Sequence, residues 1–260
     1  MATYPAFIVD AFAETPFKGN QAAVCLIDQL SDEQYPKIAA EFNFSETAYP
    51  MPLDVPRDFK KASRFSLRWF TPTIEVTLCG HATLATAHVL FNEIGNTNDE
   101  IYFETLSGEL IVQKSKTQDG AVSMNFPQFT EMYDIELSNQ QSFGAKFPAI
   151  ENPRHFVELA NEIGPCKKLT YSPTLQELIM VLDSKMTKKD FIEINPSIDK
   201  LLKIQPLDGN RSAIILTLSP ENPTKQGFVD SHGKPYDYAS RYFTPWAGID
   251  EDPATGKSWL

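Results

Sequence analysis

Glu46 stands where the sequence changes from polar to apolar. The stretch NFSETAY, residues 43–49, places this carboxylate between the end of a predicted helix and a predicted strand at 47–51. Abstraction of a proton from carbon beside a carboxylate needs a base held close to that carbon and a group that stabilises the developing charge. Glu46 fits the role of the base. The alternative is an exposed glutamate that serves only as a polar loop residue, which is the usual state of acidic side chains.

Gly80 and His81 form a second candidate group. They follow Cys79 at the start of a predicted helix whose residues 82–91 carry no formal charge other than that of His88. A helix that is apolar on every side belongs in a protein interior. Its first backbone N–H groups have no partner within the helix and attract anions. We therefore expect this helix start to hold a substrate carboxylate. A core histidine that is hydrogen-bonded to a carbonyl group is the alternative.

A short internal repeat relates two distant parts of the chain. RWFTP at residues 68–72 matches RYFTP at residues 241–245 in four of five positions, at an offset of 173 (241 − 68). Without a gap, this offset places Asp252 at the position of Cys79. Both copies close a predicted strand and lead into small residues suited to a helix N-terminus. The economical interpretation is a duplication into two lobes, each a curved sheet around one buried helix, with equivalent loops facing across a ligand-binding cleft.

Asp252 would then orient or protonate a substrate from across that cleft, although aspartate before proline is also an ordinary turn former. Cys79 supports another enzymatic hypothesis, a racemase in which a thiolate at a helix N-terminus abstracts the proton. A version with two bases needs a second thiol, whereas the gap-free repeat offers Asp252. Simple packing of a buried cysteine is the common alternative.

The second copy of the repeat is followed by much less sequence than the first. About fifty residues after Pro72 supply the buried helix and at least three predicted strands, whereas fifteen residues follow Pro245 (260 − 245). We therefore expect the second lobe to lack its buried helix and to be poorly packed, and the chain to be a truncated or alternatively spliced product. The lost burial, on the order of 10 kcal/mol, would be comparable with the stability of a whole domain.

The rest of the chain predicts many short strands and few helices. Alternating apolar residues between turn residues are typical of hairpins in a curved antiparallel sheet. The predicted strands are residues 5–12, 22–27, 47–51, 65–71, 101–106, 109–115, 121–126, 167–172, 177–183, 212–219 and 238–244. A helix is predicted over 31–42, with a capping box in SDEQ, and Pro36 either kinks it or moves its start downstream. Gly95 is the predicted stop of the apolar helix.

These elements give an α+β fold of two related lobes, each a curved, mostly antiparallel sheet around a buried helix. The region 128–165 is richer in proline and polar residues and is interpreted as the crossing between the lobes. The first lobe is therefore expected at residues 1–130 and the second, incomplete lobe at residues 131–260.

Composition and charge narrow the classes of function. The chain has 260 residues, 42% of them hydrophobic, and a net charge of −11, so we expect a globular protein that does not bind nucleic acid. The start lacks a basic segment before an apolar run, and no stretch is long enough for a membrane span, so we expect a cytoplasmic protein. The three cysteines are too few and scattered for a disulfide framework. Cys79 and His81, with no second cluster among four histidines, do not suggest structural zinc.

Four stretches, specific in combination, resemble the phenazine-biosynthesis PhzF-like isomerases, whose two-lobed fold is similar to that of diaminopimelate epimerase. The resemblance is closest to the animal phenazine-biosynthesis-like domain proteins. The stretches are DAFAETPFKGNQAAVCL at 10–26, NFSETAY at 43–49, RWFTPTIEVTLCGHATLATA at 68–87 and RYFTPWAGIDEDPATG at 241–256.

The resemblance implies proton shifts on small carboxylic acids without a cofactor or metal. It implies that Glu46 is the acid/base, and that the substrate is contacted by Asn20, Gly80, His81, Asp252 and Gly256. PhzF-like proteins are often dimers, so a homodimer is consistent with it. Two departures are Gln21, where a proline usually follows KGN, and Lys257, where a serine usually follows TG. The leading hypothesis is a PhzF-like isomerase, and the alternative is a non-catalytic truncated variant that acts as an interaction or regulatory partner.

Overall fold

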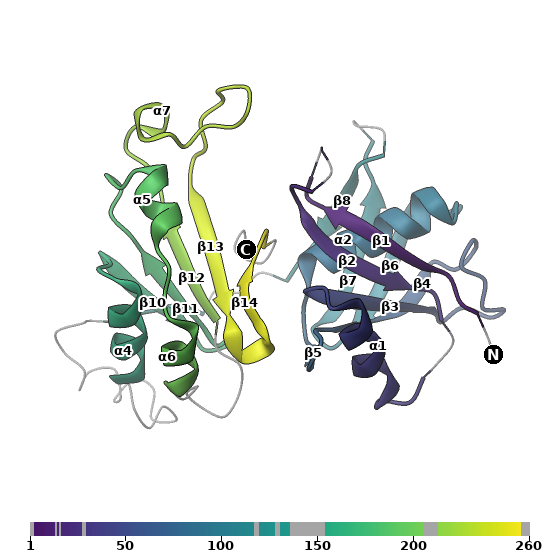
Figure 1. The fold of residues 1–260 in the computed structure, drawn as a ribbon. Helices are drawn as coiled ribbons and strands as arrows, with labels where there is room; N and C mark the ends of the chain where they lie inside the picture. The colour runs from purple at the N-terminus through teal and green to yellow at the C-terminus, as the bar shows by residue number, and fades with distance from the viewer. Residues whose placement is uncertain are drawn as a thin grey trace. The chain divides into compact units, whose positions relative to one another are not determined.

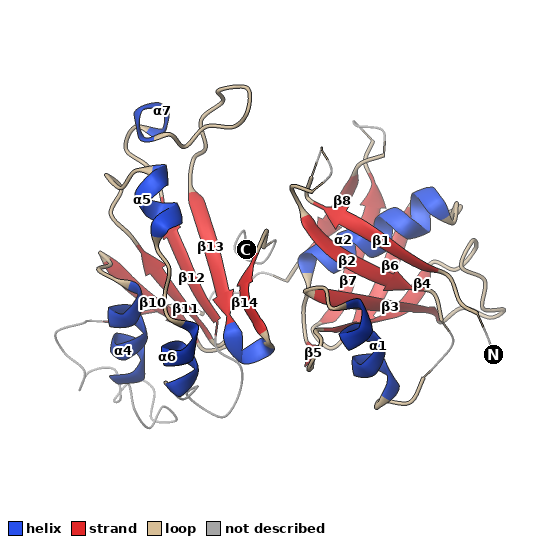
Figure 2. Cartoon of the chain, viewed as in Figure 1, coloured by secondary structure: helices blue, strands red, loops and turns tan. Residues whose placement is uncertain are grey.

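The chain folds into two compact α+β units (Figures 1 and 2). The computed structural model describes residues 3–13, 15, 17–27, 30–116, 120–127, 131–135, 154–204 and 213–255. Unit 1 comprises Met1–Gln128 and Pro253–Leu260, and unit 2 comprises Phe129–Asp252. The end of the chain therefore groups with unit 1.

Unit 1 is built on a curved sheet with the strand order β1-β2-β3-β4-β6-β7-β8, and β5 pairs with β4. The pairs β2·β3 and β4·β6 are parallel, and the other pairs are antiparallel. The predicted α+β class and the mostly antiparallel sheet are confirmed. The strands are β1 (Ala6–Ala11), β2 (Asn20–Cys25), β3 (Glu46–Pro52), β4 (Arg64–Phe70), β5 (Glu75–Val76), β6 (Glu100–Thr105), β7 (Gly108–Lys114) and β8 (Val122–Asn125).

The helix α2 (Gly80–His88) lies inside the curl of this sheet (Figure 1). It packs against β1, β2 and β3 and also against β8 at the far end of the strand order, so the sheet must curve around it. Its two threonine hydroxyls, which are buried, donate to carbonyl oxygens four residues earlier. The helix continues as a π-helical turn, Val89–Glu93, and the chain turns away at Gly95, whose φ is +71°. The predicted buried helix and its glycine stop are confirmed.

The helix α1 (Gln34–Phe42) begins later than the sequence predicts. Its N-cap is Glu33, which makes no side-chain cap. One bond of the capping box predicted from SDEQ forms, because Gln34 Oε1 accepts from the backbone N–H of Ser31 at 3.0 Å, but the N–H of Gln34 donates to the Ser31 carbonyl and not to its side chain. Pro36 explains the shift, because proline is tolerated in the first helical turn, where N–H groups have no partner within the helix. Tyr35 of α1 stacks on Phe70 with ring centroids 5.3 Å apart and attaches the helix to the sheet.

Unit 2 contains a second sheet, with the strand order β14-β13-β12-β11-β10-β9. The pair β11·β12 is parallel and the other pairs are antiparallel. The strands are β9 (Tyr133–Ile135), β10 (Lys168–Ser172), β11 (Glu177–Val181), β12 (Ala213–Leu218), β13 (Ala239–Thr244) and β14 (Ile249–Asp252). The helices are α4 (Arg154–Ile163), α5 (Lys188–Glu193), α6 (Ile198–Lys203) and α7 (Pro223–Gln226).

The expectation of a poorly packed second lobe is wrong for the face of this sheet that α4, α5 and α6 cover (Figure 2). Sixteen buried residues form one apolar cluster there, and Phe156, Leu201 and Phe228 are each exposed by 1% or less. The helices that complete this core are short, and α5 and α6 have six residues each, so helical periodicity does not reveal them. This face is therefore packed by α4, α5 and α6 without a counterpart of α2 among the described residues of unit 2.

The region 128–165 is also more structured than the sequence predicts. Its described residues include β9 and the ten-residue helix α4, which contributes Phe156, Leu159 and Ala160 to the core of unit 2. Polar and acidic residues between these apolar positions give the segment the composition of a linker, although its apolar residues share one face. Among the residues that the structure describes, no helix is long and apolar enough to cross a membrane.

Five strands of unit 2 repeat five strands of unit 1 in order and direction. Successive pairs in β1-β2-β3-β4-β5 and in β10-β11-β12-β13-β14 are antiparallel, parallel, antiparallel and antiparallel. The arginine of each RWFTP or RYFTP motif also forms the same bidentate contact with a glutamate on the next strand. Arg68 contacts Glu75 at 2.7 Å twice, and Arg241 contacts Glu251 at 2.6 and 2.8 Å. The two motifs therefore occupy equivalent places in the two sheets.

The strand register shows that the two copies differ in length after the motif. Phe70 pairs with Glu75 across β4 and β5, and Phe243 pairs with Glu251 across β13 and β14. The offset between the paired glutamates is 176 (251 − 75), three more than the offset between the motifs. The extra length lies in a 3-10 turn at Pro245–Ala247, which ends at Gly248 with a φ of +81°, and in a register shift between Phe243 and Thr244.

Asp252 is therefore not the counterpart of Cys79, and the gap-free alignment is wrong. Asp252 pairs with Tyr242 as Val76 pairs with Trp69, so Asp252 corresponds to Val76. Carried forward at the same offset, the position of Cys79 corresponds to Thr255 (79 + 176).

Candidate active site

Glu46 is fixed at the start of β3 by the sheet itself. It pairs with Ala22 in the parallel ladder between β2 and β3, and its side chain is 12% exposed. The chain enters this position through Asn43, which ends α1 in the left-handed conformation with a φ of +54°. Asparagine tolerates that conformation better than most residues. The sequence expectation that Glu46 lies between a helix end and a strand is confirmed.

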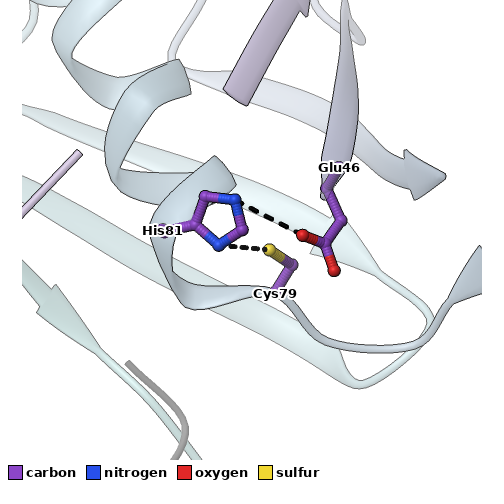
Figure 3. A group of neighbouring side chains, drawn as sticks. All are labelled: Glu46, Cys79 and His81. Carbon is purple, nitrogen blue, oxygen red and sulfur yellow. Dashed lines mark hydrogen bonds and ion pairs between the residues drawn. The ribbon is translucent and has the colours of Figure 1, made fainter. Parts of the chain in front are cut away.

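His81 lies in the first turn of α2, next to Glu46 (Figure 3). Its Nε2 is 3.3 Å from Glu46 Oε2, and its side chain is 4% exposed. Burial lowers the pKa of His81 to about 4, and a hydrogen bond with the backbone of Gln21 offsets this only in part. The imidazole is therefore neutral at pH 7, so its contact with the carboxylate is one between a neutral ring and an anion rather than a full ion pair.

Asn20 determines which nitrogen of His81 carries the proton. Asn20 is fully buried at the start of β2, and its Nδ2 donates to the carbonyl oxygen of Ala254 at 3.1 Å. The hydroxyl of Ser45 donates to Asn20 Oδ1 at 2.8 Å. Because a carbonyl oxygen only accepts, these contacts fix the orientation of the Asn20 amide.

The same Asn20 Nδ2 is 3.3 Å from Nδ1 of His81. A donor at this position requires Nδ1 to accept, which leaves the proton of a neutral imidazole on Nε2. The Nε2–H group is the one that faces Glu46. Asn20 therefore orients the ring so that an N–H group is presented to the carboxylate.

Cys79 completes the group from the N-cap position of α2. Its Sγ is 3.4 Å from Nδ1 of His81, and the residue is 5% exposed. Cys25 is a contrasting cysteine in the same unit, because burial raises its pKa to about 12 and keeps it a packed thiol. The structure therefore brings a carboxylate, an imidazole and a thiol together at the start of one buried helix (Figure 3).

The structure groups some of the predicted site residues and leaves others apart. Asn20, Glu46 and His81 contact one another as described above, and Gly80 is the buried first residue of α2. Asp252 is the last residue of β14 and of unit 2, and it is half-buried. Gly256 lies outside the described residues. The predicted cleft between lobes is a matter of how the units are arranged and stays a prediction.

Ser45 and Ala254 are site residues that the sequence reasoning missed. Ser45 precedes Glu46 in NFSETAY, and Ala254 lies in DPATG, so both are within the motifs that drew attention. Their role depends on Asn20, which is 25 positions from Ser45 and 234 positions from Ala254. Only the folded chain brings these groups together, and no spacing in the sequence indicates it.

This group of side chains is suited to moving a proton. The Glu46 carboxylate lies 3.3 Å from a neutral imidazole, within reach of a proton on a bound substrate, as a general base must be. The free N–H groups in the first turn of α2 and the dipole of that helix attract an anion to the same place. A buried site also strengthens such interactions, because water does not screen them.

Comparison with known proteins assigns the whole chain to one family. The PhzC-PhzF family, described as phenazine biosynthesis-like protein, matches residues 9–259. The human phenazine biosynthesis-like domain-containing protein is 38% identical over 260 residues, which cover 98% of this chain and 80% of that protein. An uncharacterized isomerase of Pseudomonas aeruginosa is 33% identical over 259 residues, covering 97% of this chain and 77% of that protein. The matches, which span nearly all of this chain, give no support to the prediction that it is a truncated product.

Solved structures agree with this assignment. A putative phenazine biosynthesis PhzC/PhzF protein of Clostridium difficile is 32% identical, with a TM-score of 0.66, and the match covers 98% of this chain and 79% of that chain. A predicted epimerase of Pseudomonas aeruginosa has a TM-score of 0.58 at 18% identity, with 99% of this chain and 79% of that chain covered. The second likeness concerns the fold alone.

Proposed function

Because the chain belongs to the PhzC-PhzF family of phenazine biosynthesis-like proteins, we propose that it is an isomerase that shifts a proton on a small carboxylic acid without a cofactor. The relatives named isomerases support the reaction class. The substrate is identified only by its chemistry, a carboxylate with an acidic C–H bond beside it. The single observation that carries the proposal is the 3.3 Å contact between Glu46 Oε2 and Nε2 of the buried His81.

In the proposed mechanism the substrate carboxylate binds at the first turn of α2, where Gly80 and His81 begin the helix. Glu46 removes a proton from the adjacent carbon, so that the C–H bond breaks and an O–H bond forms on Glu46. The electron pair of the broken bond delocalises onto the substrate, and the helix N–H groups stabilise the resulting charge. Glu46 then returns the proton to another carbon, so nothing is consumed and no redox partner is needed.

The neutral imidazole of His81 holds Glu46 in position before and during transfer. A neutral ring is better suited to this than an imidazolium, because a full positive charge would stabilise the ionised carboxylate and weaken it as a base. Asn20 maintains this arrangement through its contact with Nδ1. Asp252, Gly256 and a homodimer are further components that the family resemblance implies, and their roles stay predictions.

The test is incubation of the protein with a panel of small carboxylic acids in heavy water. Wild type is expected to place solvent deuterium at a C–H position of at least one acid, which nuclear magnetic resonance and mass spectrometry detect. Glu46→Gln should lower the rate by about 10²–10⁴-fold, the usual range for loss of a general base. Glu41→Gln is the matched control, because Glu41 is an exposed glutamate on α1 close in sequence.

Two results would count against the proposal. One is an absence of deuterium incorporation by wild type across the whole panel while the protein is folded. The other is incorporation by wild type that Glu46→Gln leaves unchanged, because the proton would then be carried by a different group.

A further inference from the structure

The side chains of Glu46, Cys79 and His81 each offer a metal-ligand atom, and these atoms all lie within 4.8 Å of one another (Figure 3). The three residues come from two elements, β3 and the start of α2. Sequence spacing indicates only the pair of Cys79 and His81, which is too few for a metal site. The fold adds Glu46 as a third group that spacing does not indicate.

The distances are close to those of a zinc site. Zinc bonds of about 2.0–2.3 Å to nitrogen, oxygen and sulfur place neighbouring ligand atoms of a tetrahedron roughly 3.3–3.6 Å apart. Glu46 Oε2 is 3.3 Å from Nε2 of His81, and Cys79 Sγ is 3.4 Å from Nδ1. One ion can use only one of the two ring nitrogens. A side-chain movement of roughly 1 Å is therefore needed to bring all three ligands to bonding distance.

The protonation and charge of the group also suit zinc. Metal binding needs each ligand in its deprotonated form, which here means a thiolate, a carboxylate and an imidazole nitrogen with a free lone pair. Nε2 of His81 makes no hydrogen bond to any residue that the structure describes, and the side chain is 4% exposed. A thiolate and a carboxylate together carry two negative charges, which balance those of Zn²⁺, and a neutral assembly is the one that a buried position tolerates.

We propose that Glu46, Cys79 and one ring nitrogen of His81 bind a zinc ion, which leaves one tetrahedral position for water or for a carboxylate ligand. Binding releases the thiol proton of Cys79 to solvent, and no electron is transferred. When Nε2 is the ligand, the ring proton moves from Nε2 to Nδ1, and when Nδ1 is the ligand the proton stays on Nε2. An ion at this place holds the carboxylate of Glu46, so zinc inhibits the proton transfer assigned to that residue. Zinc binding itself does not depend on the isomerase function, and either proposal can fail without the other.

The first test is titration of the metal-free, tag-free full chain with Co²⁺, which reports a thiolate ligand through a near-ultraviolet charge-transfer band. The band should appear for wild type, reach its limit at one ion per chain, and disappear when Zn²⁺ is added. Cys79→Ser should abolish it. Cys166→Ser is the control and should leave it unchanged, because Cys166 is a half-buried cysteine of unit 2. No band in wild type, or a band that persists in Cys79→Ser, would overturn the proposal.

The second test compares zinc affinity by competition with a chromophoric chelator. Glu46→Gln and His81→Asn should each weaken binding by about tenfold or more. His88→Asn, which replaces an exposed histidine at the end of the same helix, should not. Equal affinities for wild type and both site variants would contradict the assignment.

A third measurement uses only wild type, so it tests zinc binding at this group even if the Cys79 variant fails to fold. Zinc should slow alkylation of Cys79 in wild type by about tenfold or more while leaving Cys166 unaffected, as measured by peptide mass spectrometry. An unchanged rate at Cys79, or the same protection at Cys166, would show that zinc does not bind at this group.

Discussion

The two units share a framework of five strands, but among the described residues the group of Asn20, Glu46, Cys79 and His81 lies in unit 1. Phe70 pairs with Thr47 in unit 1, and its counterpart Phe243 pairs with Ile214 in unit 2. The residue before Thr47 is Glu46, and the residue before Ile214 is Ala213. By strand register, the counterpart of the proposed base Glu46 is therefore Ala213, which is buried.

The hairpin that precedes this position also differs between the two units. In unit 1, β2 begins at Asn20 after a long connection from β1. In unit 2, Ser172 pairs directly with Glu177, so the connection is a tight turn and the position of Asn20 falls on Leu175 within it. The amide that orients His81 in unit 1 thus has no equivalent at the corresponding place in unit 2.

The two units share the residues that hold neighbouring strands together, and they differ in the polar residues of the candidate site. Both keep the arginine and phenylalanine of the motif and a glutamate opposite, with each arginine also over an aromatic ring. These contacts fix the pairing of adjacent strands. The sheet of unit 2 supports its own core, and the contacts among Asn20, Glu46 and His81 are formed within unit 1.

The largest effect is expected from truncating the equivalent phenylalanines. Phe70→Ala and Phe243→Ala should each cost about 3–5 kcal/mol, because both rings are almost fully buried. Native-state hydrogen exchange, read separately in the strands of each unit, measures the two costs. Ile192→Ala, which removes an exposed side chain from α5, is the control. A cost for Phe243→Ala far below that for Phe70→Ala would show that unit 2 is poorly packed after all.

His81 should make the free energy of unfolding depend on pH. The substitution His81→Asn should remove this dependence. Its pKa is about 4 when folded and about 6.5 when unfolded, so the unfolded chain binds the additional proton between these values. The free energy of unfolding should therefore fall by about 3 kcal/mol as the pH drops from about 6.5 to about 4. Below that range both states are protonated and the contribution stays lost.

Urea unfolding of wild type and His81→Asn between pH 4 and pH 7 measures this difference. His88→Asn, on the exposed end of α2, should keep the slope of wild type. A wild-type slope identical to that of His81→Asn would mean that His81 titrates normally and is not held neutral by burial.

Asn20→Leu introduces into unit 1 the residue found at the equivalent position of unit 2. It should cost about 1–3 kcal/mol, because it leaves the hydroxyl of Ser45 and the carbonyl of Ala254 without their partner. Thermal unfolding measures the loss. Gln21→Leu is the neighbouring control, since Gln21 is only half-buried and its amide makes a long contact of 3.4 Å with Asp10. An equal loss of stability in the two variants would show that the contacts of Asn20 contribute no more than those of Gln21.

The smallest effect is expected from the shared arginines. Arg68→Lys and Arg241→Lys remove bidentate contacts with Glu75 and Glu251 that are partly exposed, so each should cost about 1 kcal/mol or less. Chemical denaturation of both variants tests whether the two contacts are equivalent. A loss of several kcal/mol in only one unit would show that the repeated motif has different roles in the two sheets.

Much of the fold can be predicted from the sequence because alternation and turn residues indicate strands directly. The eleven predicted strands overlap strands of the structure, and the uncharged stretch after Gly80 indicates a buried helix. Short elements are not predicted in this way. Examples are β5, which has two residues, and α5 and α6, which have six residues each. Apolar periodicity needs more residues than these elements contain.

The site is only partly predictable, because its contacts join residues far apart in the chain. Glu46 and His81 are indicated by their local motifs, yet nothing in those motifs gives the 3.3 Å contact between them. The equivalence of Asp252 and Cys79 fails because a longer turn and a register shift together add three residues to the second copy. Strand register reveals this change, and a gap-free alignment does not.

The central claim is that unit 1 holds a neutral imidazole whose N–H group faces a carboxylate that is only 12% exposed. Nitrogen-15 nuclear magnetic resonance of His81 tests it without a substrate. We predict the neutral form with the proton on Nε2 at pH 7, and a midpoint near the pKa of about 4 that burial imposes. A ring protonated at pH 7, a proton on Nδ1, or titration near pH 6.5 as in an exposed histidine would contradict the account.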